Sequence, residues 1–208
     1  MAKAFLSASK FEVSINKAAL LKEVTVGNNG KITGREVRKY VLPIIEEAQE
    51  KLIKDFYSHS VTKEIEAGPN ASNSSGTLNG YGNLFSFIGF DRGEDPIAAI
   101  GEVIKQKLSV TVRAISSGRF RISIANPPSK EELFSVSQIP WASGSSWAEG
   151  IEKGLSNLGS FLYRGKGIPK SRSGTGVQIK NDLRAASFRT QPYISKLVDK
   201  FYKDVTKF

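Results

Sequence analysis

The sequence contains no cysteine and only one histidine, His59. Without cysteine the protein can form neither disulfides nor thiolate metal sites, so its stability must come from burial and hydrogen bonding. No run approaches the roughly 18 uncharged apolar residues that a membrane-spanning helix needs. The basic start, Met1–Leu6, has too short an apolar stretch for a secretory signal, so we expect synthesis in the cytoplasm and no membrane partner.

The 208 residues, 39% of them hydrophobic, are enough to bury a core. The net charge of +10 is uneven, because residues 163–208 hold eleven Lys and Arg against three Asp and Glu. Residues 1–162 carry only +2. We therefore expect an α+β assembly domain over 1–162 and a basic arm with a C-terminal helix over 163–208. The basic arm has two possible roles: it binds an anionic partner, or it is a solvated tail that keeps the protein soluble.

Hydrophobic periodicity predicts an α+β fold, with a long amphipathic helix packed on a mostly antiparallel sheet, long loop arms and extra C-terminal helices. Alternation predicts a strand at 10–16 and a hairpin of strands near 108–114 and 120–124, with Arg113, Arg119 and Arg121 on its polar face. Capping boxes, proline positions and apolar stripes predict the helices. They are a helix over 33–58, one after Asp95-Pro96, one each after Ser129 and Ser146, and one that begins near Pro192. The stripe of the helix after Ser146 includes Leu155, Leu158 and Leu162.

Residues 66–83 form an unusually long predicted loop with four Gly, four Asn and three Ser. The apolar run 84–90 that follows it predicts a strand. A long unstructured loop beside such a strand is typical of an interaction element, although a solvated loop beside an ordinary core strand fits the same pattern. The oligomer-interface residues predicted here are Asn73, Ser75, Thr77, Leu78, Tyr81, Leu84, Phe85 and Phe87. We expect residues 66–83 to be extended or poorly ordered in the free monomer.

The sequence offers few residues that could carry catalytic chemistry. His59 has no visible orienting partner, so a helix-end histidine is the simpler interpretation. The acidic groups Glu46, Glu47, Glu50 and Asp91, Glu94, Asp95 match no metal-binding spacing and resemble solvated faces. The short G-x-G at 174–176 lacks the remainder of a phosphate-binding loop. We predict no catalytic residue, metal site or cofactor, and a protein that is not an enzyme.

The basic arm supplies the alternative function, a nucleic-acid-binding protein that uses residues 163–189. Its cations are interleaved with Gly, Ser and Thr, which suffices for salt-sensitive, sequence-independent contact with a phosphate backbone. It lacks the interleaved aromatics that single-strand stacking requires. The residues predicted to meet an anionic partner are Arg164, Lys166, Lys170, Arg172, Lys180 and Arg184.

The order of these segments resembles the tail-completion or neck family of tailed-phage virion proteins. In that family a helix precedes a segment of the type P-V-x-T-G-x-L-x-x-S-I, and a β-hairpin follows. Val61-Thr62, Ser75–Leu78 and Asn83–Ile88 stand in the comparable places, and Ser171–Gln178 adds a local similarity. The long Asn/Ser/Gly insertion and the extra C-terminal helices depart from the family pattern.

The resemblance implies a non-enzymatic structural subunit of the virion, between head and tail or at the upper end of the tail. Its implied partners are copies of itself in a hexameric or dodecameric ring and other phage neck, connector or tail proteins. Packaged DNA is a further expected partner by non-specific contact.

Overall fold

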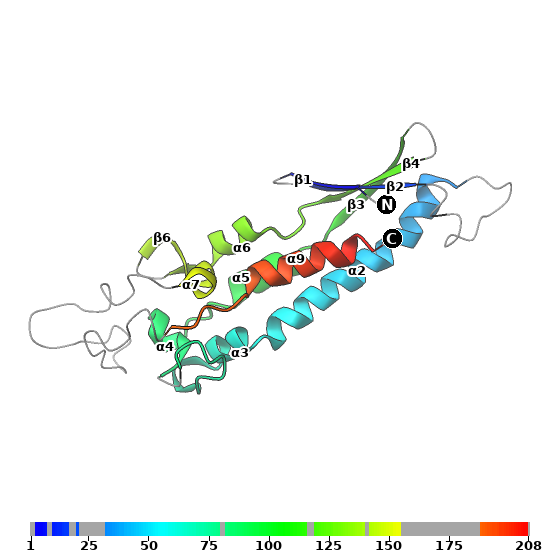
Figure 1. Ribbon diagram of the computed structural model, residues 1–208. Helices are drawn as coiled ribbons and strands as arrows, with labels where there is room; N and C mark the ends of the chain where they lie inside the picture. The colour runs from blue at the N-terminus through cyan, green and yellow to red at the C-terminus, as the bar shows by residue number, and fades with distance from the viewer. Residues whose placement is uncertain are drawn as a thin grey trace, which may run out of the picture. The chain divides into compact units, whose positions relative to one another are not determined.

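The computed structural model describes residues 3–7, 10–16, 20, 32–79, 82–115, 119–139, 142–154 and 188–207. The fold is α+β, as predicted (Figure 1). The chain divides into two compact units. The sheet unit comprises Met1–Leu52, Lys105–Ser129 and Val198–Phe208, and the helical unit comprises Ile53–Ile104 and Lys130–Leu197. The boundaries between the units fall inside α2 (Gly34–Ser58) and α9 (Ile194–Val205).

The sheet unit holds a four-stranded antiparallel sheet in the order β1-β2-β4-β3. Its strands are β1 (Lys3–Ser7), β2 (Lys10–Asn16), β3 (Ser109–Ile115) and β4 (Arg119–Ala125). The predicted strand at 10–16 and the predicted hairpin are confirmed. The β1 strand was not predicted, because its five residues carry no clear alternation and pair only through β2.

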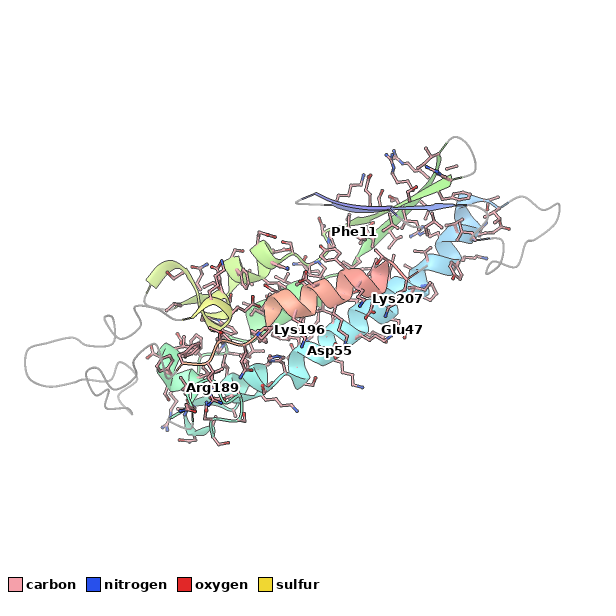
Figure 2. All side chains as sticks on the ribbon, in the orientation of Figure 1. Phe11, Glu47, Asp55, Arg189, Lys196 and Lys207 are labelled. Carbon is pink, nitrogen blue, oxygen red and sulfur yellow. The ribbon has the colours of Figure 1, made fainter. Side chains whose placement is uncertain are left out.

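One face of the sheet is apolar, because alternate residues of neighbouring strands come into register. Phe11 faces Ile124 on β4, which faces Val110 on β3. Phe11 is labelled in Figure 2, and its ring lies 4.8 Å from that of Tyr202 on α9. The C-terminal half of α9 therefore packs on this face.

The helix α2 confirms the long helix predicted over 33–58. Thr33 and Glu36 form the predicted capping box, in which the Thr33 N–H donates to Glu36 Oε2 at 2.7 Å and the Glu36 N–H to Thr33 Oγ1 at 3.4 Å. Pro43 lies inside the helix, which continues past it. The buried stripe is Val37, Val41, Ile45, Ala48, Leu52 and Phe56.

The helical unit contains the last turn of α2 and a series of short elements. These are α3 (Ser60–Glu66), the 3-10 turn η1 (Gly68–Asn70), α4 (Leu84–Ile88), α5 (Ala98–Lys105), α6 (Lys130–Val136), β5 (Gln138–Ile139), β6 (Ala142–Ser146), α7 (Trp147–Lys153) and the start of α9. Its core is built on Trp147 and Tyr193, whose ring centroids lie 6.2 Å apart, with Phe56 6.1 Å from Tyr193. The predicted helices after Asp95-Pro96, Ser129 and Pro192 are confirmed. The helix predicted after Ser146 is confirmed at its start, but α7 ends at Lys153 with Gly154 as its C-cap, before the rest of the predicted stripe.

The predicted strand over 84–90 is wrong, since Leu84–Ile88 is helical. The Asn83 side chain accepts the Ser86 N–H at 2.9 Å and caps the N-terminus of the helix, and Gly89 ends it in the left-handed region at φ 89°. A short apolar run cannot be assigned by periodicity alone, so the two local caps decide the outcome.

Residues 155–162, with Leu155, Leu158 and Leu162, and the basic segment 164–176 lie outside the described residues. Of the predicted arm 163–208, residues 188–197 belong to the helical unit and 198–207 to the sheet unit. Tyr193 and Phe201 are almost fully buried there, so these parts of the predicted arm contribute to the core of the units.

Candidate functional site

A buried carboxylate, Glu64 on α3, organises the segment that links α3 to α4. Its side chain is 1% exposed. Glu64 Oε2 accepts the Ser75 N–H at 2.7 Å, while Oε1 accepts the Leu84 N–H at 2.8 Å and the Asn73 side-chain amide at 3.0 Å. Bonds from N–H groups to an ionised acceptor are the stronger kind, and here they satisfy an otherwise costly buried carboxylate. We call Glu64 and these three donors the Glu64 clamp.

Further hydrogen bonds hold the same segment. Ser75 Oγ lies 2.8 Å from Thr77 Oγ1, and both residues are buried. The Asn83 amide donates to the Pro69 carbonyl at 2.8 Å. Residues 71–79 and 82–83 lie outside any helix or strand. These side-chain hydrogen bonds therefore hold both ends of the segment in place.

The segment 188–193 fastens this loop to the rest of the helical unit. The Arg189 N–H donates to the Thr77 carbonyl at 2.8 Å, and the Gln191 side-chain amide donates to the Ser75 carbonyl (Arg189 is labelled in Figure 2). The Gln191 backbone N–H donates to the Ile151 carbonyl at 3.2 Å. Because Ile151 is buried on α7, the loop is tied through this segment to the core.

The start of α9 is capped by a side chain from α7. Glu152 Oε1 accepts the N–H groups of Tyr193 at 3.2 Å and of Ser195 at 2.6 Å. A carboxylate at a helix N-terminus satisfies orphan amides and complements the helix dipole. Glu152 therefore fixes where the chain enters α9.

Five of the eight predicted interface residues are buried inside the chain itself. These are Ser75, Thr77, Leu78, Leu84 and Phe85, each at most 9% exposed. They have no appreciable surface to offer a partner, because the Glu64 clamp and α4 turn them inward. An interface role for these five would require the chain to rearrange on assembly, and it stays a prediction. The prediction that 66–83 is extended or poorly ordered in the free monomer stays a prediction for the protein in solution. In the structure Glu66 is the last residue of α3 and Gly68–Asn70 is a 3-10 turn, so the loop begins later than predicted.

The other predicted site residues lie elsewhere. Asn73 and Phe87 are half-buried, and the Phe87 ring stacks on that of Phe188 at 5.9 Å. Tyr81 lies outside the described residues, as do the six cations predicted to meet an anionic partner, Arg164, Lys166, Lys170, Arg172, Lys180 and Arg184.

His59 lies at the junction of α2 and α3, where it has a structural role. Its Nδ1 accepts the Val61 N–H at 3.3 Å and caps α3, and its ring lies 4.8 Å from that of Tyr193. Burial, with a contribution from the charge of Lys196, holds the pKa of His59 below its ordinary value, which keeps the neutral, accepting ring. The Tyr193 hydroxyl lies 2.7 Å from Thr62 Oγ1, and burial raises the pKa of that phenol.

The acidic groups singled out from the sequence do not converge. Glu46, Glu47 and Glu50 are exposed, and Glu47 pairs with Lys51 at 2.7 Å. The Asp95 carboxylate accepts the N–H groups of Ile97 and Ala98 at 3.1 Å and serves as a cap. Among the described residues no group of three or more His, Asp or Glu side chains is placed to hold a metal ion.

Comparison of the chain with protein-family models, with curated proteins and with solved structures finds no match. Within the part of the chain that the structure describes, no helix is both long enough and apolar enough to cross a membrane.

Proposed function

We propose that the chain is a non-enzymatic structural subunit of a tailed-phage particle, in the neck or at the upper end of the tail. It assembles with copies of itself into a ring of six or twelve subunits and contacts other neck, connector or tail proteins. The order of elements supports this proposal. The helices α2 and α3 precede the Gly/Asn/Ser segment, and the β3–β4 hairpin comes later, after the short helices α4 and α5. The family resemblance implies this order of helix, segment and hairpin, without the two intervening helices.

The two edges of the four-stranded sheet carry the proposal. Among the residues that the structure describes, the outermost strands of the sheet are β1 on one side and β3 on the other. Since every neighbouring pair is antiparallel, β1 and β3 run in opposite directions. Placing β3 of one copy beside β1 of the next continues the antiparallel alternation without a break. An open sheet edge presents unpaired backbone donors and acceptors, which is the surface used in strand addition.

Such a contact is heterologous, because two different strands meet. Heterologous contacts that repeat around an axis close into a ring when the rotation fits. The sheet edges thus provide the joining surface that the buried residues of the 71–84 segment do not.

The mass of the purified full chain tests the proposal. Native mass spectrometry and mass photometry over a concentration series are expected to show a closed species of six or twelve copies, visible as rings by electron microscopy. In purified particles that contain the chain, antibody labelling is expected at the neck or tail. A chain that stays monomeric at every concentration and binds no virion protein contradicts the proposal.

Proline substitutions on β3 locate the joining edge. Thr111 and Val112 are adjacent, so one N–H points toward β4 and the other toward the open edge. Proline removes one backbone donor, which an edge strand tolerates only where that donor faces solvent. Of Thr111→Pro and Val112→Pro, one variant is expected to fold and lose ring formation, and the other to lose stability. Intact rings in both variants would exclude β3 as the joining edge.

A further inference from the structure

The face of the sheet opposite the apolar core is polar and basic. Register places the side chains of alternate residues of β2, β3 and β4 together on this face. The cations among them are Lys10, Arg113, Arg119 and Arg121, and the hydroxyls are Ser14, Ser109, Thr111 and Ser123. Glu12 is the one acid among the described side chains of this face. We call this surface the basic sheet face.

Two arginines of this face stand directly opposite each other. Arg113 on β3 is the register partner of Arg121 on β4, and both are exposed. Like charges in directly opposed positions destabilise a sheet. Arg119 lies two residues before Arg121 in β4, so both side chains are on the same side of the strand. Local sheet stability therefore does not account for the concentration of arginine.

Only part of this charge is neutralised within the chain. Glu12 pairs with Lys10 at 2.9 Å and with Arg121 at 3.6 Å, and it accepts the Ser123 hydroxyl at 3.2 Å. Among the described residues Arg113 and Arg119 have no ion-pair partner. Their guanidinium groups are exposed at the β3–β4 hairpin and available to an external anion.

We infer that the basic sheet face binds the phosphodiester backbone of double-stranded nucleic acid, independently of sequence. Guanidinium groups donate fork-shaped pairs of hydrogen bonds that match phosphate oxygens. Hydroxyls of Ser and Thr are further phosphate donors, and the exposed Thr111 stands next to Arg113 along this side of β3. Ser123, its register partner, is buried and already donates its hydroxyl to Glu12.

The composition of the face favours a nucleic acid over an acidic protein. Protein interfaces have an apolar core enriched in aromatic residues, whereas nucleic-acid interfaces are polar and strongly positive. Apart from Ile115 and Ala125, the described side chains of this face are polar or charged. Among the described side chains of β2, β3 and β4 on this face none is aromatic, and contact with phosphates alone suits a duplex.

The inference does not rest on ring assembly, because a single copy already carries the whole face. The test uses the full chain, a fluorescent duplex of random sequence and a salt series. Arg113→Gln/Arg119→Gln removes the two unpaired cations. Lys54→Gln/Lys63→Gln is the matched control, because it removes two exposed cations of α2 and α3 in the helical unit and changes the net charge equally.

The expected result is a change in the salt dependence of binding. Each lost phosphate contact lowers the slope of log Kobs against log salt by about 0.9, so the arginine variant should lose about 1.8. The control should keep the slope, and Arg113→Lys/Arg119→Lys should largely restore it. Circular dichroism confirms that each variant is folded.

Three results overturn the inference. The first is that the unmodified chain does not bind the duplex at low salt. The second is that the arginine variant binds the duplex as the control does. The third is that polyglutamate of matched charge displaces the duplex as well as unlabelled duplex does, which assigns the face to an acidic protein. If the unmodified chain binds the duplex but forms no rings, only the proposed function is contradicted, so the two failures can be told apart.

Discussion

Replacing Glu64 by glutamine keeps the shape of the side chain but exchanges one acceptor oxygen for a donor. Glu64 Oε1 and Oε2 each accept a backbone N–H, from Leu84 and Ser75 respectively. Whichever way the glutamine amide is oriented, its NH₂ group faces one of these two donors. One buried N–H is then left without an acceptor in the Glu64→Gln variant.

The cost follows from that unpaired group. An unsatisfied buried donor costs about 1–3 kcal/mol, so we expect Glu64→Gln to lower the free energy of unfolding by about 2 kcal/mol. Glu64→Ala loses the acceptor for all three donors and should cost about 4 kcal/mol. In a chain of this length each kcal/mol lowers Tm by ~2–4 °C, so Glu64→Gln should lower Tm by ~4–8 °C.

Urea unfolding followed by circular dichroism measures the loss, and hydrogen exchange locates it. The amides of Ser75 and Leu84 should lose protection while those of Val13 and its neighbours on β2 keep theirs. Glu66→Gln is the control, because Glu66 is exposed at the end of the same helix and should change stability by less than about 0.5 kcal/mol. The reasoning fails if Glu64→Gln is as stable as Glu66→Gln, or if protection is lost evenly across both units.

Three further predictions concern the helical unit. The pKa of His59 is lowered in the folded protein, so its contribution to stability is complete above the unfolded pKa near 6.5 and is lost as the pH falls through the lowered folded pKa. From about pH 7.5 to about pH 4.5 the free energy of unfolding should therefore fall more for the unmodified protein than for His59→Gln. Parallel curves for the two proteins refute this. Tyr193→Phe should cost about 1–2 kcal/mol, and combining it with Thr62→Val should cost less than the sum of the single changes, whereas strict additivity argues against the hydrogen bond. Ser146→Ala removes the N-cap of α7 and should cost about 1 kcal/mol in a thermal melt, while Ser146→Asp retains most of the stability; equal losses contradict a capping role.

The elements that the sequence predicts correctly are those with strong local signals. The hairpin strands alternate strictly and the long helix begins with a capping box, so neither needs tertiary information. The 84–90 run fails because its five apolar residues fit a strand and a short helix equally well. The pairing of β1 depends on β2, a relation that a five-residue pattern does not express.

The clamp could be predicted only in part. Val61 and Ile65 are one turn apart on α3, and Glu64 lies between them on the same buried side. A lone carboxylate on an apolar stripe indicates a buried acceptor, and this signal was present. Its partners were not predictable, because Ser75 and Leu84 stand eleven and twenty residues away and only folding brings their amides together.

The clamp also changes how the 71–84 segment would take part in assembly. A disordered arm must lose conformational entropy when it binds, which offsets part of the interaction free energy. Here Glu64 has already fixed the backbone at Ser75 and Leu84, so exposed positions such as Ser72, Ser74 and Asn79 would meet a partner in a preset arrangement. If this loop contacts a neighbouring subunit, it does so as a rigid surface. Weakening the clamp should then reduce ring stability even though Glu64 itself touches no neighbour.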